Sequence, residues 1–326
     1  MKRALITGIT GMDGSHMADL LLSKGYEVYG MERHKSVPNR TNIKHIEEQI
    51  HFVKGDLTDF NSLVSVLEES EPDEVYNFAA QAFDGDSWKL AEMTSNVTGL
   101  GVLRLLDAIR TVNKKIKIQQ ASSSGMYGKT AGGIINESHP FKPHSPYASA
   151  KVFAHHAIQN FRDTYGIFAC ASICFTHESE RRGFEFVTRK ISSAAARISL
   201  GLQKQLKLGT ITTERDWGYA PDYCEGFWLM LQQPQPEDYI FATGEAYSVE
   251  DFLDEAFFNV GIPDWDSCVV FDKSLVRLAE IPCLLGDATK AKTSLGWKPK
   301  VKFEELVARM VQNDIRLNQN KNNDLH

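Results

Sequence analysis

This chain of 326 residues has a net charge of −6, with 42% hydrophobic and 24% charged residues. The hydrophobic content suffices for a buried core, and the length predicts two lobes that share one cleft. The acidic balance, without a long basic run, excludes nucleic acid as the main partner, and no apolar stretch approaches membrane-spanning length. Because a strand-like segment begins at the N-terminus and leaves no room for a signal peptide, we expect a cytoplasmic protein. The five cysteines show no Cys-x-x-Cys spacing, so neither a disulfide nor a metal centre is expected.

The first thirty residues have the pattern of a strand, a glycine-rich turn and a helix. The apolar run Arg3–Thr7 ends in glycines with the spacing Gly-x-x-Gly-x-x-Gly, and a helical pattern follows from Met17. Gly8 permits a tight turn, Gly11 lets backbone N–H groups approach a pyrophosphate, and Gly14 allows the helix to pack closely on the strand. In this βαβ context the pattern predicts a dinucleotide-binding loop. Besides these glycines, Thr10 and Asp13 are candidate cofactor ligands.

The second predicted strand, Glu27–Met31, ends where the adenosine ribose of such a cofactor lies. Glu32 favours a free 2′-hydroxyl and therefore NAD, whereas Arg33 in a cationic cluster favours the 2′-phosphate of NADP. We expect NADP through Arg33, with NAD as the alternative. The next strand-like segment ends near Asp56 and Leu57, which are expected to lie near the adenine. The segment after it ends near Ala79, Ala80 and Gln81, which are expected to lie beside the nicotinamide ribose.

Tyr147 and Lys151 carry the chemistry expected of this chain. They are four residues apart, so on a helix they share one face and the ammonium makes the phenol easier to deprotonate. A phenolate there could accept a proton from a substrate hydroxyl during hydride transfer.

Strand and helix patterns alternate up to about residue 175, which predicts an α/β fold with a doubly wound parallel sheet of the Rossmann type and a smaller C-terminal lobe. Residues 1–175 with about 216–246 are expected to bind NAD(P). Residues 176–215 and 247–320 are expected to bind the substrate, and only 321–326 read as a frayed tail.

Nine segments spread over nearly the whole chain resemble the extended short-chain dehydrogenase/reductases, and within them the GDP-mannose 4,6-dehydratases. They are Gly8–Ser15, Ala79–Gln81, Met126–Gly128, Ser145–Tyr147, His177–Ser179, Arg181–Gly183, Phe186–Lys190, Arg215–Trp217 and Leu284–Asp287. The resemblance implies a GDP-sugar substrate and a homodimer or homotetramer.

The resemblance also implies how the site works. Tyr147 would deprotonate the C4 hydroxyl of the sugar while a hydride leaves C4, with Lys151 lowering the phenol pKa and Ser123 bonding the same hydroxyl. His177 and Arg182 join the expected cofactor ligands. The expected substrate contacts are Ser87, Ser123, Ser124, Thr176, Val187, Lys190, Arg215, Arg277 and Glu280. Alternatively, Arg215 forms a structural ion pair with Asp216, and Arg277 lies on the surface.

One position departs from the family pattern. Dehydratases of this family carry a glutamate two residues before the tyrosine of the Met-Tyr-Gly segment, and this chain has Gly125 there. Without that acid/base, we expect hydride transfer at C4 without dehydration, as in a 4-dehydrogenase, 4-ketoreductase or epimerase of a GDP-hexose or GDP-heptose. The first alternative is a 4,6-dehydratase in which Asp84 or Asp86 replaces the glutamate, unless both are solvated loop carboxylates. The second is a non-catalytic nucleotide-sugar binding subunit.

Overall fold

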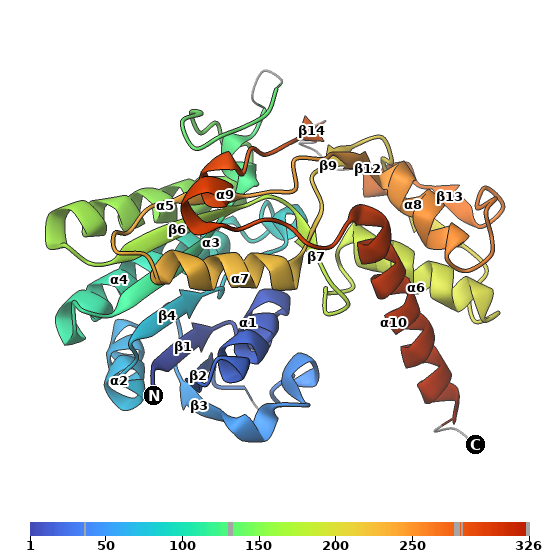
Figure 1. The fold of residues 1–326 in the computed structure, drawn as a ribbon. Coiled ribbons are helices and arrows are strands. Elements are labelled where there is room, and N and C mark those ends of the chain that lie inside the picture. The colour runs from blue at the N-terminus through green and yellow to red at the C-terminus, as the bar shows by residue number, and fades with distance from the viewer. Residues whose placement is uncertain (36, 130–132, 277–280, 282, 324–326) are drawn as a thin grey trace.

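A parallel sheet of seven strands forms the centre of the molecule in the computed structural model, which describes residues 1–35, 37–129, 133–276, 281 and 283–323 (Figure 1). The strand order is β11-β6-β5-β4-β1-β2-β3, and every neighbouring pair is parallel. The doubly wound sheet predicted from the sequence is therefore confirmed. Its strands are β1 (Arg3–Thr7), β2 (Glu27–Glu32), β3 (Ile50–Lys54), β4 (Glu74–Asn77), β5 (Lys117–Ser123), β6 (Ala169–Cys174) and β11 (Tyr239–Phe241).

Helices cover both faces of this sheet, because side chains of each strand alternate between two apolar cores. In β1, Ala4 and Ile6 pack into one core and Leu5 into the other. The first core takes side chains from α1 (Met12–Ser23), α7 (Ala220–Leu231) and α9 (Thr289–Leu295). The second takes them from α2 (Phe60–Ser70), α4 (Gly101–Val112) and α5 (Pro146–Tyr165). Short helices precede α4, namely α3 (Ala91–Thr94) and the π-helical turn η4 (Ser95–Leu100).

A smaller lobe lies beside the carboxyl ends of the central strands (Figure 1). Its three long helices, α6 (Val187–Ser199), α8 (Val249–Phe258) and α10 (Phe303–Asn323), enclose a separate core. In that core the ring of Phe303 stacks on Trp217 and on Tyr247, with centroids 5.9 Å and 4.0 Å apart. Short strand pairs complete the lobe: β7 (His177–Glu178) with β10 (Gly218–Tyr219), β8 (Leu206–Leu208) with β13 (Val269–Phe271), and β9 (Glu214–Arg215) with β12 (Tyr247–Ser248) and β14 (Cys283–Leu284).

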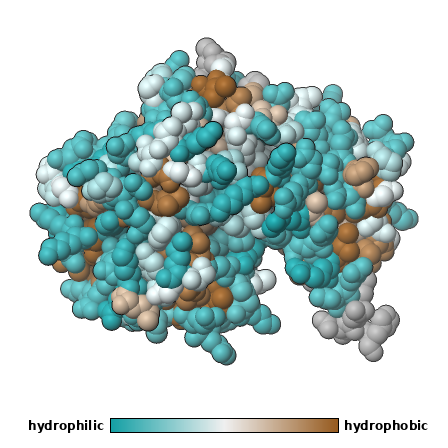
Figure 2. Space-filling model, in the orientation of Figure 1, coloured by the Kyte–Doolittle hydropathy of each residue, from teal (hydrophilic) through white to brown (hydrophobic). Residues whose placement is uncertain are grey.

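A deep notch separates α10 from the sheet domain (Figure 2). A cavity of about 330 Å³ lies on α10, lined by Glu180, Arg309, Gln312, Asn313 and Arg316. Within the described residues, no helix is long and apolar enough to cross a membrane.

Candidate active site

The glycine-rich loop lies at the carboxyl end of β1. Gly8 has φ +67°, and a Cβ there would come within 2.9 Å of the backbone nitrogen of Ala79. A Cβ on Gly14 would lie 2.3 Å from the carbonyl oxygen of Gly8. Glycine is therefore required at both positions, by the turn and by close helix–strand packing. The helix begins at Met12, earlier than the pattern from Met17 indicated, with Gly11 as its N-cap, so its free N–H groups lie within the loop. A backbone open in this way fits a bound pyrophosphate.

Asp13 connects this loop to the second lobe. Its carboxylate is 3.0 Å from His177 Nε2, and the His177 ring stacks on Tyr223 with centroids 4.5 Å apart. Burial alone would raise the pKa of Asp13, but His177 and the charge of Arg182 hold it below its usual value. Arg182 itself donates to the Glu178 carboxylate and to the carbonyl oxygen of His177. The structure thus brings these predicted cofactor residues together as one partly buried network.

The loops after β3 and β4 carry the other predicted cofactor residues. Asp56 accepts hydrogen bonds from the backbone and hydroxyl of Thr58, both at 2.8 Å, so its carboxylate closes a turn. Ala79 donates its backbone N–H to Thr7 Oγ1 at 3.1 Å, which holds the loop after β4 against β1. The Gln81 side chain donates to the carbonyl of Phe83 at 3.0 Å. Among the remaining cofactor candidates, Leu57 and Lys151 are buried, Thr10 and Ala80 are partly buried, and Arg33 is exposed.

The three predicted catalytic residues meet at the end of β5. The Ser123 hydroxyl acts to lower the pKa of the Tyr147 phenol, and Lys151 Nζ lies 5.6 Å from the centre of the Tyr147 ring. Burial lowers the pKa of Lys151 to about 8. Burial raises the pKa of Tyr147, the Ser123 hydrogen bond opposes that rise, and the negative charge of Asp84 adds to it. Lys151 donates to the carbonyl of Ala121 at 2.6 Å, which fixes its ammonium beneath the phenol.

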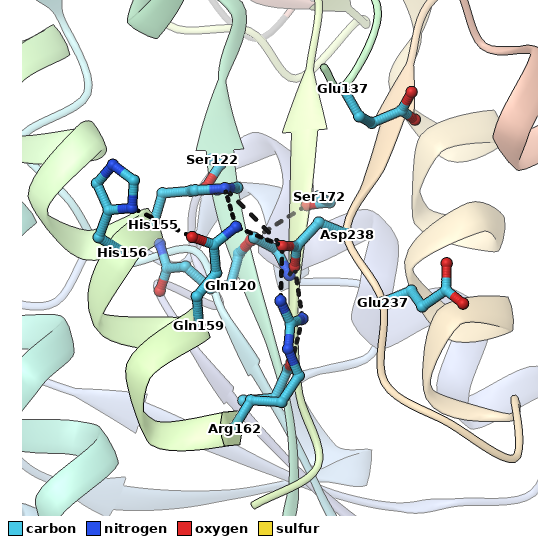
Figure 3. Close-up of polar contacts among 12 residues, drawn as sticks. Gln120, Ser122, Glu137, His155, His156, Gln159, Arg162, Ser172, Glu237 and Asp238 are labelled. Atoms are coloured by element: carbon cyan, nitrogen blue, oxygen red, sulfur yellow. Dashed lines mark hydrogen bonds and ion pairs between the residues drawn. The ribbon is translucent and has the colours of Figure 1, made fainter. Parts of the chain in front are cut away.

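A polar network on the same face of α5 anchors this helix to the sheet (Figure 3). His155 follows Lys151 by one turn and lies 3.4 Å from Ser122 Oγ, through Nδ1. Arg162 forms two bonds of 2.9 Å with Asp238, which also accepts a bond from Gln159 at 3.1 Å. His155, Gln159, Arg162 and Asp238 line a cavity of about 260 Å³. The network holds the helix on β5 and β6, so Tyr147 and Lys151 keep their places.

Asp84 lies at the start of this same helix. It belongs to the 3₁₀ turn η3 (Asp84–Asp86), and its Oδ1 accepts a 2.5 Å hydrogen bond from the hydroxyl of Ser145, the N-cap of α5. Asp86 is exposed, and no hydrogen bond of its carboxylate is found among the described residues. The contact of Ser145 with Asp84 was not foreseen, although Ser145 before Pro146 is a helix-start signal.

Gly125 lies directly after β5, in the 3₁₀ turn η5 (Ser124–Tyr127). A Cβ at this position would meet Ser123 Oγ at 3.3 Å and Ala148 Cβ at 4.0 Å, so a side chain fits here only if the Ser123 hydroxyl shifts slightly. Ser87 is fully buried, and its hydroxyl finds no partner among the described residues. A buried hydroxyl without a partner is costly, and this fits a group that a substrate completes.

The remaining substrate candidates lie where the second lobe begins. Thr176 joins β6 to β7, Val187 is the first residue of α6, and Lys190 is exposed one turn later. Arg215, in β9, donates to the carbonyl of Ile281 at 2.7 Å. Ser124 is buried at the start of η5. Arg277 and Glu280 lie outside the described residues. The described chain contains no group of three or more His, Cys, Asp or Glu that could hold a metal ion.

A Rossmann sheet, a glycine loop without room for side chains, and a Ser-Tyr-Lys set over β5 together define an NAD(P)-dependent enzyme of the short-chain dehydrogenase/reductase class. Solved structures of two nucleotide-sugar enzymes have the same fold. The dTDP-glucose 4,6-dehydratase of Streptomyces venezuelae, solved with NAD, has a TM-score of 0.85 at 25% identity, covering 98% of both chains. The UDP-glucose 4-epimerase of Thermus thermophilus, also with NAD, has a TM-score of 0.83 at 26% identity, covering 96% of this chain and 98% of the other.

The chain belongs to the GDP-mannose 4,6-dehydratase family, whose model matches residues 5–310. It is 48% identical to GDP-mannose 4,6 dehydratase 1 of Arabidopsis thaliana, over 97% of this chain and 90% of the relative. Its identity to the human GDP-mannose 4,6 dehydratase is 45%, over 96% of this chain and 91% of that protein. The family resemblance inferred from the sequence motifs is thereby confirmed.

Proposed function

We propose that this chain is a 4,6-dehydratase of a GDP-sugar of the GDP-mannose type, in which Asp84 provides the acid/base that Gly125 cannot. The names of the family and of its curated relatives support dehydration over the simple C4 redox chemistry that the sequence pattern placed first. The observation that carries the assignment to Asp84 is its hydrogen bond to the N-cap of the catalytic helix, beside Tyr147.

In this proposal, Tyr147 and Asp84 each act as acid or base in a different part of the reaction. Tyr147 accepts the proton of the C4 hydroxyl, helped by the charge of Lys151 and the hydrogen bond of Ser123. A bound nicotinamide would supply the acceptor for the hydride from C4 and the donor of the hydride to C6. The ketone at C4 acidifies the proton at C5, which Asp84 removes, and Asp84 then protonates the C6 hydroxyl as it leaves. The C–H bonds at C4 and C5 and the C–O bond at C6 break, a new C–H bond forms at C6, and Tyr147 delivers to C5 the proton that it took from the C4 hydroxyl. One water is released, and the keto group remains at C4.

The two lobes divide the ligands in this proposal. Residues 1–175 with about 216–246 hold NADP, or NAD, and residues 176–215 and 247–320 hold the GDP-sugar. The cationic Lys190 and Arg215 suit a pyrophosphate, and the orphaned hydroxyl of Ser87 suits a sugar hydroxyl. Ser124, Thr176 and Val187 complete the substrate contacts, and the enzyme works in the cytoplasm as a homodimer or homotetramer.

A second candidate is hydride transfer or epimerisation at C4 without dehydration, and the missing side chain at Gly125 favours it. The intact Ser123, Tyr147 and Lys151 would support this chemistry unaided. A non-catalytic binding subunit is disfavoured by the same three residues, and loss of all turnover in Tyr147→Phe would exclude it.

Mass spectrometry of GDP-mannose and a GDP-heptose, incubated with the enzyme and each oxidised cofactor, separates these functions. A product lighter by one water is expected, and Asp84→Asn should slow its formation about a hundredfold or more, the usual contribution of a positioned acid/base. Asp86→Asn is the matched control and should change little, since Asp86 is exposed. Gly125→Glu should restore dehydration in the Asp84→Asn background, because it returns the family's carboxylate and only the Ser123 hydroxyl must shift slightly to admit its Cβ. An isobaric product, or one lighter by two hydrogens, would instead establish the second candidate.

A further inference from the structure

The carboxylate at the end of β2 is already bound within the protein. In Rossmann enzymes that use NAD, an acidic side chain at this place accepts a bond from the ribose 2′-hydroxyl. Here Glu32 is only 8% exposed. Arg40 contacts both of its oxygens, with Nε 2.9 Å from Oε1 and Nη2 2.7 Å from Oε2. Lys54 Nζ lies 3.1 Å from Oε2. The bond from Arg40 lowers the pKa of Glu32, so the carboxylate stays ionised inside this group.

Arg40 is held in place from the side opposite Glu32. Its guanidinium packs 3.7 Å from the centre of the Phe52 ring, and Nη1 lies 2.7 Å from Oε1 of Glu47. A planar cation fixed by a ring and two carboxylates is preorganised for bidentate contact. The segment that carries Arg40 runs on through the 3₁₀ turn η1 (Thr41–Ile43) to the glycine loop, where Asn42 Nδ2 donates to the carbonyl of Thr10 at 3.1 Å.

The charges of this group cancel, and one cation next to it does not take part. Glu32 and Glu47 are balanced by Arg40 and Lys54. Arg33, directly after Glu32, is exposed and has no ion-pair partner among the described residues. A ribose that approaches the end of β2 therefore meets a neutralised carboxylate and an available guanidinium. A 2′-phosphate is favoured in such a field, whereas an unpaired carboxylate would repel it.

We propose that Arg40 determines the cofactor preference by withdrawing the Glu32 carboxylate from the adenosine ribose, so that Arg33 binds the 2′-phosphate of NADP. Arg40 acts through Glu32 and is a positioning residue. The inference rests on the binding of NAD(P), and it is independent of whether the enzyme dehydrates its sugar.

Calorimetric titration of the sugar-free protein with NADP and with NAD tests this assignment. In Arg40→Met, Glu32 keeps only its bond to Lys54 and can turn toward the ribose. The ratio of NADP to NAD affinity should therefore fall about tenfold, which corresponds to ~1.4 kcal/mol of binding free energy. Adding Glu32→Gln to Arg40→Met removes the liberated charge and should return the ratio to that of the unaltered protein. Arg3→Met is the control, because Arg3 also pairs with two glutamates, Glu27 and Glu71, on the opposite end of the sheet.

Three results would overturn the proposal. Equal weakening of both cofactors in Arg40→Met would mean that Arg40 only anchors its loop. An unchanged ratio, or a double variant that keeps the altered ratio, would remove Glu32 from the argument. If Arg40→Met does not fold, Glu32→Gln alone decides: weaker NAD binding would show that Glu32 contacts the ribose, whereas unchanged NAD binding supports its withdrawal.

Discussion

Because Lys151 Nζ lies 5.6 Å from the centre of the Tyr147 ring, we expect the two residues to titrate as one pair, which would set the pH dependence of the proposed first chemical step. The active form, a phenolate beside an ammonium, has lost one proton relative to the fully protonated pair. Because burial lowers the pKa of Lys151 to about 8 and raises that of Tyr147, the pair loses its first proton near pH 8. Below that value the active fraction grows with pH, and above it the fraction stays level until the second proton is lost.

The initial rate of C4 oxidation, measured at saturating cofactor from about pH 6 to about pH 10, should therefore rise toward pH 8 and then level off. In Lys151→Arg the guanidinium does not titrate in this range, so the rate should continue to climb above pH 9 as the phenol alone ionises. A flat profile through pH 8 in the unaltered enzyme would contradict the coupled pair.

At the scale of single elements, the helix that carries the pair also positions Asp84, through Ser145. Ser145 Oγ accepts the backbone N–H of Ala148 at 3.1 Å and donates to Asp84 at 2.5 Å. Ser145→Ala should cost about 1 kcal/mol of folding free energy, as usual for a lost N-cap, and should also slow dehydration by releasing Asp84.

Ser248→Ala provides the comparison for this variant. Ser248 caps α8 with a full capping box, far from the catalytic helix in sequence, and its loss should destabilise the protein by a similar amount. Dehydration at saturating substrate should be unchanged in Ser248→Ala. Equal turnover in the two variants, measured beside urea unfolding, would refute the positioning role of Ser145.

The sequence predicted those elements whose signals are local. The glycine spacing after β1 and the four-residue separation of Tyr147 and Lys151 reflect turn and helix geometry, and both have the expected arrangement in the structure. The pairing of Glu32 with Arg40 and Lys54 could not be predicted, because Lys54 belongs to β3 and Arg40 to the loop between β2 and β3. The sequence alone showed that Gly125 replaces the family's glutamate. The position of Asp84 could not be predicted, because it depends on a hydrogen bond with Ser145, 61 residues away in the sequence.

At the scale of the whole molecule, Asp216 lies beside the edge strand β11, where the chain passes from one lobe to the other. Its carboxylate accepts backbone N–H groups from Thr243 at 2.7 Å and Gly244 at 2.9 Å, where the chain leaves β11. Burial raises the pKa of Asp216 to about 6, and these bonds oppose the rise. The crossing between the lobes is thus tied by polar contacts, whereas each lobe has an apolar core of its own.

Within the smaller lobe, one buried ion pair holds α10 against α6. Arg189 Nη2 lies 2.8 Å from Asp314 Oδ1, the two side chains are 4% and 2% exposed, and Ser192 donates to the other oxygen of Asp314 at 2.7 Å. Arg189 also donates to the carbonyl of Glu180, next to the residues proposed to hold the cofactor.

Asp314→Asn leaves the buried guanidinium without a counter-charge, and this should cost about 3 to 5 kcal/mol in urea unfolding. The double variant Arg189→Met with Asp314→Leu removes both charges and should recover most of that loss, since an apolar pair of similar volume avoids the desolvation of two ions. Glu305→Gln breaks an exposed ion pair with Arg309 on the same helix and should cost less than about 1 kcal/mol. If Asp314→Asn costs no more than Glu305→Gln, α10 is held by its apolar face alone, and the ion pair has no part in joining α10 to α6.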